Sequence, residues 1–235
     1  MKYIFILLIL CPWATAFAQW ETQFVREQGI ALYDIHLIKG EKGVAVGKLG
    51  TILTTEDGFR TWKRRATKTT KDFFCVGFFD SLTAIVAGSD GLMLRSTDAG
   101  VSWKPISSMT NDTLYRISMI SPISAIAVGA NGTILKTIDQ GLHWDKIGSS
   151  VQSAIRSIAF RNDIAVAVGY DGIILRSEDM GENWEIVNSG IHTNLYTVSF
   201  ATNNTLLAGG DSTLIISSTD GGRTWKFNQI LYRVL

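Results

Sequence analysis

The chain is poor in cysteine, proline and histidine, and it carries almost no net charge. Its 235 residues include two cysteines, three prolines and three histidines, and the formal net charge is +1. The histidines, His36, His143 and His192, lack the spacing of metal ligands, so we predict no metal site. A near-neutral charge argues against nucleic acid as a partner, because such domains usually carry a clear basic excess. Since a Gly-x-Ser-x-Gly elbow and a phosphate-binding glycine loop are also missing, we predict no catalytic residue and no cofactor.

The N-terminus has the features of an export signal. Lys2 precedes an apolar run over residues 3–10, which is too short for a permanent transmembrane helix. Small residues at Ala16 and Ala18 then predict signal-peptidase cleavage before Gln19. We therefore expect an exported protein that is periplasmic, attached to the cell surface or extracellular.

Cleavage would divide the chain into a signal peptide, residues 1–18, and one mature domain, residues 19–235. Lipidation at Cys11 is disfavoured because Leu10 is not the small residue that a lipoprotein signal requires; a retained N-terminal anchor is the other alternative. Cys75 would be the one cysteine left, so no internal disulfide could form. It lies in an apolar run, where we predict a buried structural thiol.

What the chain does have is internal repetition. Tryptophans recur at intervals of 40 or 41 residues, at Trp62, Trp103, Trp144, Trp184 and Trp225. A glycine lies fifteen residues before each of them, at Gly47, Gly88, Gly129, Gly169 and Gly210. Five units in register predict a repeat architecture.

Each unit has the pattern of four short strands. In the third, residues 114–120 and 125–128 predict two strands, a turn at Asn131-Gly132 leads to a third strand over 133–137, and Trp144 opens a fourth. Asn-Gly and Asp-Gly pairs favour tight hairpin turns because both positions tolerate positive φ. Four strands repeating about every 40 residues are typical of propeller blades, so we predict an all-β protein, a β-propeller of four-stranded blades.

The loop before each tryptophan resembles the Asp-box, or BNR repeat, with the pattern Ser/Thr-x-Asp-x-Gly-x-Thr/Ser-Trp. The second and fifth copies are complete, whereas Phe59 replaces the glycine of the first, and His143 and Asn183 replace the Thr/Ser of the third and fourth. The box aspartates are Asp57, Asp98, Asp139, Asp179 and Asp220. A carboxylate in a tight loop accepts several hydrogen bonds, and the tryptophan buries apolar surface. Five equivalent copies around a ring cannot converge on one site, so we interpret aspartates and tryptophans as structural.

Among Asp-box proteins, the units most resemble the photosystem II stability and assembly factor family. Residues 125–144 and 165–184 match its pattern Ala-Val-Gly-x-x-Gly-x-Ile-Leu-x-Ser/Thr-x-Asp-x-Gly best. The resemblance implies an exported, non-enzymatic propeller that assists the assembly of membrane complexes. That family has seven blades and this sequence has five full units, which leaves two alternatives: a closed five-bladed ring or part of a larger ring.

The alternative function is a carbohydrate-active enzyme or lectin, because sialidases are also Asp-box propellers. Their Phe/Tyr-Arg-Ile-Pro motif is missing. The segment from Tyr115 through Arg116 and Ile117 approaches it but continues with Ser118. No pair of carboxylates stands out from the repeats as a glycoside hydrolase would require. We therefore predict that the protein is not an enzyme.

Two clusters of basic residues are candidate partner-binding surfaces. Lys63, Arg64 and Arg65 belong to a basic run after the first box. Its lysines and arginines either keep the outer strand from pairing with the edge strand of another sheet, or they bind an acidic partner or anionic headgroups. Arg95, Lys136 and Arg176 occupy one third-strand position in successive units. They form either an arc of cations or pairs with box carboxylates. The partner we expect is a protein, such as a membrane-complex subunit, with a glycan or peripheral membrane contact as alternatives.

Overall fold

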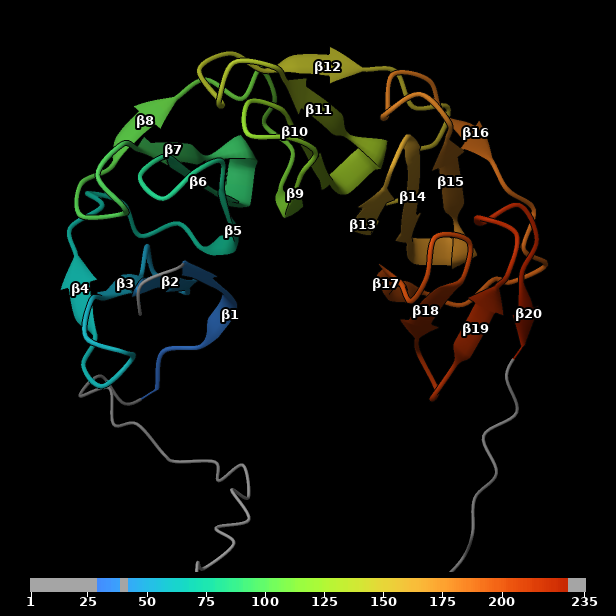
Figure 1. Ribbon diagram of the computed structural model, residues 1–235, viewed down its shortest axis with the longest axis horizontal. Coiled ribbons are helices and arrows are strands. Elements are labelled where there is room, and N and C mark those ends of the chain that lie inside the picture. The colour runs from blue at the N-terminus through green and yellow to red at the C-terminus, as the bar shows by residue number, and fades with distance from the viewer. Residues whose placement is uncertain (1–28, 39–41, 228–235) are drawn as a thin grey trace, which may run out of the picture.

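The described residues form five four-stranded antiparallel sheets arranged side by side around an open arc (Figure 1). The computed structural model describes residues 29–38 and 42–227; the predicted signal peptide and its cleavage site lie outside this range. Within each sheet the strands follow in sequence order, with the first strand innermost (Figure 1). No helix in this part of the protein is long and apolar enough to cross a membrane.

The sheets, here called blades 1 to 5, contain twenty strands. Blade 1 comprises β1 (Leu32–Ile38), β2 (Lys42–Gly47), β3 (Ile52–Thr55) and β4 (Lys63–Arg65). Blade 2 comprises β5 (Phe73–Phe78), β6 (Ala84–Gly88), β7 (Met93–Ser96) and β8 (Lys104–Ile106). Blade 3 comprises β9 (Leu114–Met119), β10 (Ala125–Gly129), β11 (Ile134–Thr137) and β12 (Asp145–Ile147). Blade 4 comprises β13 (Ile155–Arg161), β14 (Ile164–Gly169), β15 (Ile174–Ser177) and β16 (Glu185–Ile186). Blade 5 comprises β17 (Leu195–Phe200), β18 (Leu206–Gly210), β19 (Ile215–Ser218) and β20 (Lys226–Phe227).

The predicted blade pattern is confirmed, including the turn between the second and third strands. In blade 3 this turn is a single 3-10 turn at Ala130–Gly132, in which Asn131 and Gly132 have φ of 52° and 67°. The equivalent Asp90 and Asp171 have φ of 53° and 57°. The Asn-Gly and Asp-Gly pairs therefore do supply the positive φ that the hairpin needs.

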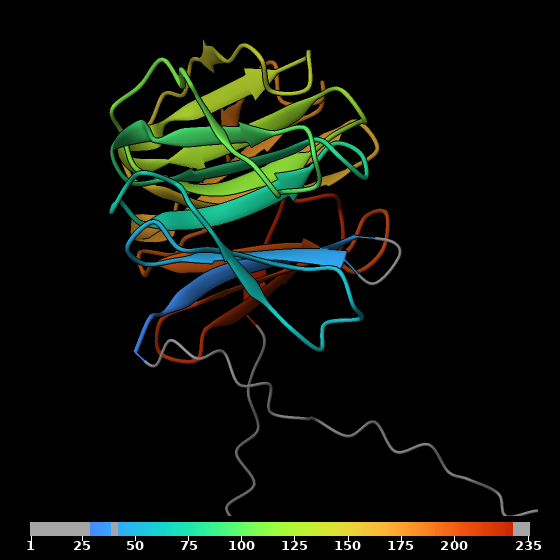
Figure 2. The same ribbon diagram turned by 90° about the vertical axis from the view of Figure 1, so that its left-hand side faces the viewer.

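The blades pack face to face, and the apolar core lies between them rather than within them. Four buried clusters account for the four junctions of the arc, and each combines residues from two adjacent blades. At the first junction, for example, Val44 and Ile52 of blade 1 pack with Phe73 and Val86 of blade 2. Figure 2, turned by 90°, shows the first blades stacked in this way. β1 and β17 lie at opposite ends of the arc, so the described blades do not form a closed five-bladed ring (Figure 1).

Each Asp-box loop is held shut by its aspartate. In the fifth box, Oδ1 of Asp220 accepts hydrogen bonds from the hydroxyl of Ser218 at 2.7 Å and the backbone N–H of Thr224 at 2.9 Å. The hydroxyl of Thr224 donates to Oδ2 at 2.6 Å. The third and fourth boxes, which lack the Thr/Ser, keep this last contact, since Nδ1 of His143 and Nδ2 of Asn183 lie 2.6 and 2.7 Å from their box carboxylates.

The box glycine allows the loop to lie against the preceding blade. A Cβ on Gly100 would lie 2.8 Å from Cγ2 of Val44, a β2 residue of the blade before it. The position also has positive φ, 87° at Gly100, and Phe59 adopts 67° at the equivalent place in the first box. Phe59 therefore occupies a backbone region that is costly for a bulky side chain.

The box tryptophans also stabilise the box loops and the blade junctions. The indole N–H groups of Trp103, Trp184 and Trp225 donate to the carbonyl of the glycine three residues earlier, at 2.9–3.1 Å. Trp144 is buried within the cluster between blades 2 and 3. Each box thus fastens its own fourth strand, and the boxes of blades 2 to 5 pack on the blade before them.

The cations Arg95, Lys136 and Arg176 join successive blades. The Nε atoms of Arg95 and Arg176 donate to the carbonyls of Gln140 and Gly221, at 2.8 and 2.7 Å. Nζ of Lys136 donates to the carbonyl of Met180 at 3.1 Å. Every acceptor is the residue after the aspartate of the next blade's box, so each cation reaches forward by one blade.

These contacts decide between the two interpretations of the cations. Arg176 is 1% exposed and Lys136 is 8% exposed, so neither belongs to an exposed arc. Carboxylates of the box loops also contribute: Lys136 pairs with Glu182 at 2.5 Å and Arg176 with Glu178 at 2.7 Å. The predicted arc of partner-binding cations is therefore wrong at these two positions, because equivalence in the repeat does not reveal that the side chains point into the blade junction.

We expect Arg176→Met to weaken the junction between blades 4 and 5. The methionine fills similar space but leaves the Gly221 carbonyl without its charged donor. Hydrogen bonds to charged groups contribute about 1.5–3 kcal/mol, so the free energy of unfolding in urea should fall by about that amount. The matched control is Arg223→Met, which removes an exposed partner of the same Glu178 and should cost less than about 1 kcal/mol. Equal losses in both variants would contradict the assignment.

The box aspartates also predict acid sensitivity. The side-chain hydrogen bond from Thr61 lowers the pKa of Asp57 to about 2, and the backbone N–H of Asn183 is the main cause of the same lowering at Asp179. An aspartate in the unfolded chain has a pKa of about 3.9. The stabilisation from these carboxylates is therefore complete above that value and is lost as the pH falls toward 2.

The urea midpoint should accordingly drop between pH 5 and pH 2, and Asp179→Asn should drop less steeply than the wild type. Asp145→Asn is the control, because Asp145 lies on the exposed strand β12 outside the box loops. The control should keep the wild-type slope. An unchanged slope in Asp179→Asn would show that box protonation does not limit stability in acid.

Candidate functional site

A row of side chains follows the inner rim of the arc, one from each blade. It consists of the second residue of every first strand, namely Tyr33, Phe74, Tyr115, Arg156 and Tyr196. Each of these residues coincides with a break in strand register, because its neighbours pair with consecutive residues of the second strand and it pairs with none. Bulges of this kind re-aim a side chain. Five bulges at one position therefore turn five side chains toward the same edge of the arc.

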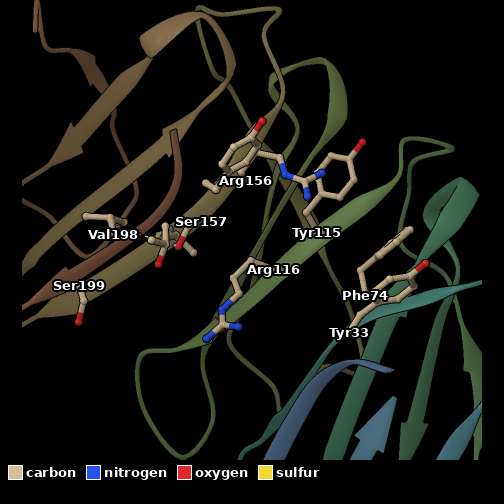
Figure 3. Close-up of a pocket in the computed structure, with 11 residues that line it drawn as sticks. Tyr33, Phe74, Tyr115, Arg116, Arg156, Ser157, Val198 and Ser199 are labelled. Carbon is tan, nitrogen blue, oxygen red and sulfur yellow. Dashed lines mark hydrogen bonds between the residues drawn. The ribbon is translucent and has the colours of Figure 1, made fainter. Parts of the chain in front are cut away.

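The rim side chains touch one another across the blade junctions. The ring centroids of Tyr33 and Phe74 are 5.0 Å apart, and those of Phe74 and Tyr115 are 5.7 Å apart. The guanidinium carbon of Arg156 lies 4.0 Å from the ring centroid of Tyr115. Figure 3 shows Tyr33 beside Phe74 and the guanidinium of Arg156 against the ring of Tyr115.

The row continues into blade 5 through Tyr170, a residue of the turn between β14 and β15. The guanidinium carbon of Arg156 lies 5.5 Å from the Tyr170 ring, and the Tyr170 and Tyr196 rings meet edge to face at 6.1 Å. The Tyr196 hydroxyl donates to Asp211 at 2.7 Å, and this hydrogen bond raises the pKa of Tyr196. The rim is thus a connected ladder of rings with one guanidinium inserted in it.

The ladder borders a cavity of about 410 Å³. Next to the rings, the cavity is lined by the residues that follow them on β9, β13 and β17, among them Arg116, Ser157 and Ser199 (Figure 3). Its described lining contains aromatic, cationic, hydroxyl-bearing and aliphatic side chains but no aspartate or glutamate. Such a lining suits a ligand with both an anionic and an apolar part.

Below the rim, polar side chains tie the first strands together. Oδ2 of Asp34 accepts the backbone N–H of Val76 at 3.0 Å, and NH1 of Arg116 lies 3.4 Å from Oδ1 of the same carboxylate. Ser157 plays the equivalent part farther along, where its Oγ accepts the backbone N–H of Val198 at 3.3 Å. Asp34 thereby fixes blades 1, 2 and 3 relative to one another, and Ser157 fixes blades 4 and 5.

The other predicted site residues lie elsewhere. Lys63, Arg64 and Arg65 form β4, the outer strand of blade 1, with Lys63 and Arg64 exposed. Nε of Arg65 donates to the hydroxyl of Thr54 at 2.7 Å, which holds this arginine against its own blade. The basic strand is therefore on the outside of the arc, away from the rim. Cys75 is buried, as the sequence predicted, and burial raises the pKa of its thiol.

Sequence reasoning did not identify the rim, although a signal for it was present. The five rim residues repeat at intervals of 40 or 41, the same as the tryptophans. In four units the residue is aromatic, and Arg156 breaks the series in the fourth. The described residues also contain no group of three or more histidine, cysteine, aspartate or glutamate side chains placed to hold a metal ion.

Comparisons with known proteins agree with this architecture. Two solved YCF48 structures are similar to the chain. YCF48 bound to a D1 peptide has a TM-score of 0.61 and 21% identity, and the match covers 84% of this chain and 80% of that one. YCF48 from Cyanidioschyzon merolae has a TM-score of 0.55 and 20% identity, and the match covers 85% of each chain. The GH74 xyloglucanase from Xanthomonas campestris also matches, with a TM-score of 0.68 but 12% identity, and only 38% of its length is covered. No curated protein matches.

These structures share the propeller fold with the chain. Because the sequence identities are low, the similarity shows the fold alone. The family comparison is more specific. A family model described as photosynthesis system II assembly factor YCF48 matches residues 13–110 and 101–192, which together make up most of the sequence. The chain therefore belongs to the YCF48 family of photosystem II assembly factors.

Proposed function

We propose that this protein is a non-catalytic, assembly-factor-like scaffold that binds a segment of another protein at the rim of its propeller arc. The observation that carries the proposal is the ladder of rings and one guanidinium beside a cavity of about 410 Å³. Clefts lined by aromatic groups with a few polar side chains are the usual form of ligand sites. Family membership supports a protein ligand, since a solved YCF48 structure is described as bound to a D1 peptide.

The geometry of the rings favours a protein segment over a glycan. Sugars bind to aromatic side chains by lying flat on an open ring face. At this rim, the ring of Phe74 is flanked by Tyr33 and Tyr115, and one face of Tyr115 is covered by Arg156. The rings therefore offer edges and hydroxyl groups to a ligand, which suits side chains and backbone amides better than a flat pyranose.

Hydrolysis of a glycan is the second candidate, because GH74 enzymes share the fold. A glycoside hydrolase needs a pair of carboxylates, one on each side of the bond that it cleaves. The described cavity lining has hydroxyl groups and guanidinium groups instead. We therefore place binding ahead of catalysis for this site.

The partner is expected on the outer side of the cell membrane, as an exported protein or an exposed part of a membrane complex. This part of the proposal rests on the signal-like residues 1–18. The exposed Lys63 and Arg64 of β4 are proposed as a second, weaker contact with an acidic partner or anionic headgroups.

Site-specific photocrosslinking tests the proposal directly. Tyr33 and Tyr196, each 42% exposed, would be replaced one at a time by the photoreactive residue p-benzoylphenylalanine, which keeps an aromatic ring at the rim. The control position is Ile138, which is 68% exposed on the box loop of blade 3. Illumination in an envelope extract of the native host should give one crosslinked protein at both rim positions and none of it at Ile138.

The same product at all three positions would indicate non-specific adsorption and contradict the rim as the site. Release of reducing sugar from xyloglucan by the purified protein would instead favour the glycoside hydrolase alternative.

A further inference from the structure

Arg156 differs in chemistry from the other four rim residues. The other four blades place an aromatic ring at this position. Blade 4 supplies a guanidinium instead, held between the rings of Tyr115 and Tyr170 at 4.0 and 5.5 Å. A cation in this position is attracted to both ring faces, and its side chain is fixed before any ligand arrives.

The hydrogen-bonding groups of this guanidinium are unused within the described part of the protein. Nε of Arg156 is buried and has no hydrogen-bond partner. No carboxylate of the described residues forms an ion pair with it, whereas Arg116, the neighbouring cation of the cavity, pairs with Asp34 at 3.4 Å. A buried N–H donor without a partner costs about 1–3 kcal/mol. The Arg156 residue as a whole is only half-buried and lines the cavity, so a ligand would reach the guanidinium through its terminal NH2 groups.

Other groups near Arg156 also favour an anionic acceptor. Ser157 follows it on β13 and lines the same cavity, and its hydroxyl group can donate a hydrogen bond while its Oγ accepts the Val198 N–H. Arg116 lines the same cavity and is half exposed. The described cavity lining contributes no carboxylate of its own. The site therefore presents several donors and a local excess of positive charge.

We infer that Arg156 is the carboxylate subsite of the rim: its guanidinium receives one carboxylate of the bound protein segment, while the flanking rings contact the apolar part of that segment. This inference rests on the proposed function and specifies the chemistry of the ligand. A planar guanidinium matches a carboxylate through two parallel N–H···O hydrogen bonds. The carboxylate comes either from an aspartate or glutamate side chain or from the C-terminus of the bound polypeptide.

Arginine-selective NMR would test this on the full-length protein. Protein labelled with ¹⁵N at arginine gives Nε–H signals, and the Arg156 signal is assigned by its loss in Arg156→Lys. Three probes are titrated: acetyl-Gly-Gly-Asp-amide, which has a side-chain carboxylate; acetyl-Gly-Gly-Gly with a free C-terminus; and acetyl-Gly-Gly-Asn-amide, which has neither. We expect a saturable shift of the Arg156 signal with one or both acids and none with the asparagine probe. Which acid binds tells the two sources of carboxylate apart.

Variants measure how much the guanidinium contributes. Binding of the acidic probe, followed by the backbone amide of Ser157, should weaken about 10-fold or more in Arg156→Met, as expected for the loss of a charged hydrogen bond. Arg161→Met, at the far end of the same strand, should bind as the wild type does. If Arg156→Met does not fold, the titration of the wild type and of Arg156→Lys still decides the question.

Two outcomes would overturn the inference. One is an Arg156 signal that neither acid moves; the other is an equal shift with the asparagine probe, which would make Arg156 a packing residue of the rim. Crosslinking at Tyr33 and Tyr196 with no carboxylate effect would leave the proposed function standing and remove only the subsite. Carboxylate binding without any crosslinked protein would leave Arg156 as a carboxylate-binding residue, but it would contradict the proposed function and, with it, the assignment of the carboxylate to a bound protein segment.

Discussion

The packing of the Asp-box loops of blades 2 to 5 on the preceding blade is the contact on which the rest of the arc depends. A single four-stranded sheet cannot bury both of its faces, so each blade is stable only against its neighbours. The aspartate closes the loop, the glycine lets it approach, and a cation of the preceding blade binds the carbonyl that the closed loop presents. Side-chain hydrogen bonds, backbone geometry and charge therefore act at one place in the junctions between blades 2 and 5, whereas Thr54 takes the position of the cation at the first junction.

Regular junctions have a consequence at the inner edge of the arc. Because successive blades are held in the same relation, equivalent residues of the first strands lie next to each other. The bulge at the second residue then places Tyr33, Phe74 and Tyr115 in a row, with Phe74 in contact with both tyrosines. The rim is thus a product of the same repetition that builds the core, and its side chains need no loop insertions to meet.

The sequence allowed the blades to be predicted well because their determinants are local and repeated. Tryptophan spacing located five units, and Asn131-Gly132 located a turn whose φ values agree. The direction of individual side chains could not be predicted in this way. Lys136 and Arg176 occupy equivalent positions in the repeat, and that equivalence would be the same if they pointed to solvent or into a blade junction. Their direction becomes clear only once the box loop of the next blade is placed beside them. The rim was not predicted because the regular spacing of Tyr115 and Arg156 does not reveal that a bulge turns both side chains toward the same edge of the arc.

In a repeat protein, function is best sought where equivalent positions carry unlike residues. Positions that serve the fold repeat with little change, as the five box aspartates do, because every junction makes the same demand. The rim position repeats in aromatic character, except at Arg156. A ring of identical groups would offer a ligand the same contact at each blade and so could not fix its register. One guanidinium among four rings breaks that equivalence, and under the proposed function it would give a bound segment a single place for its carboxylate.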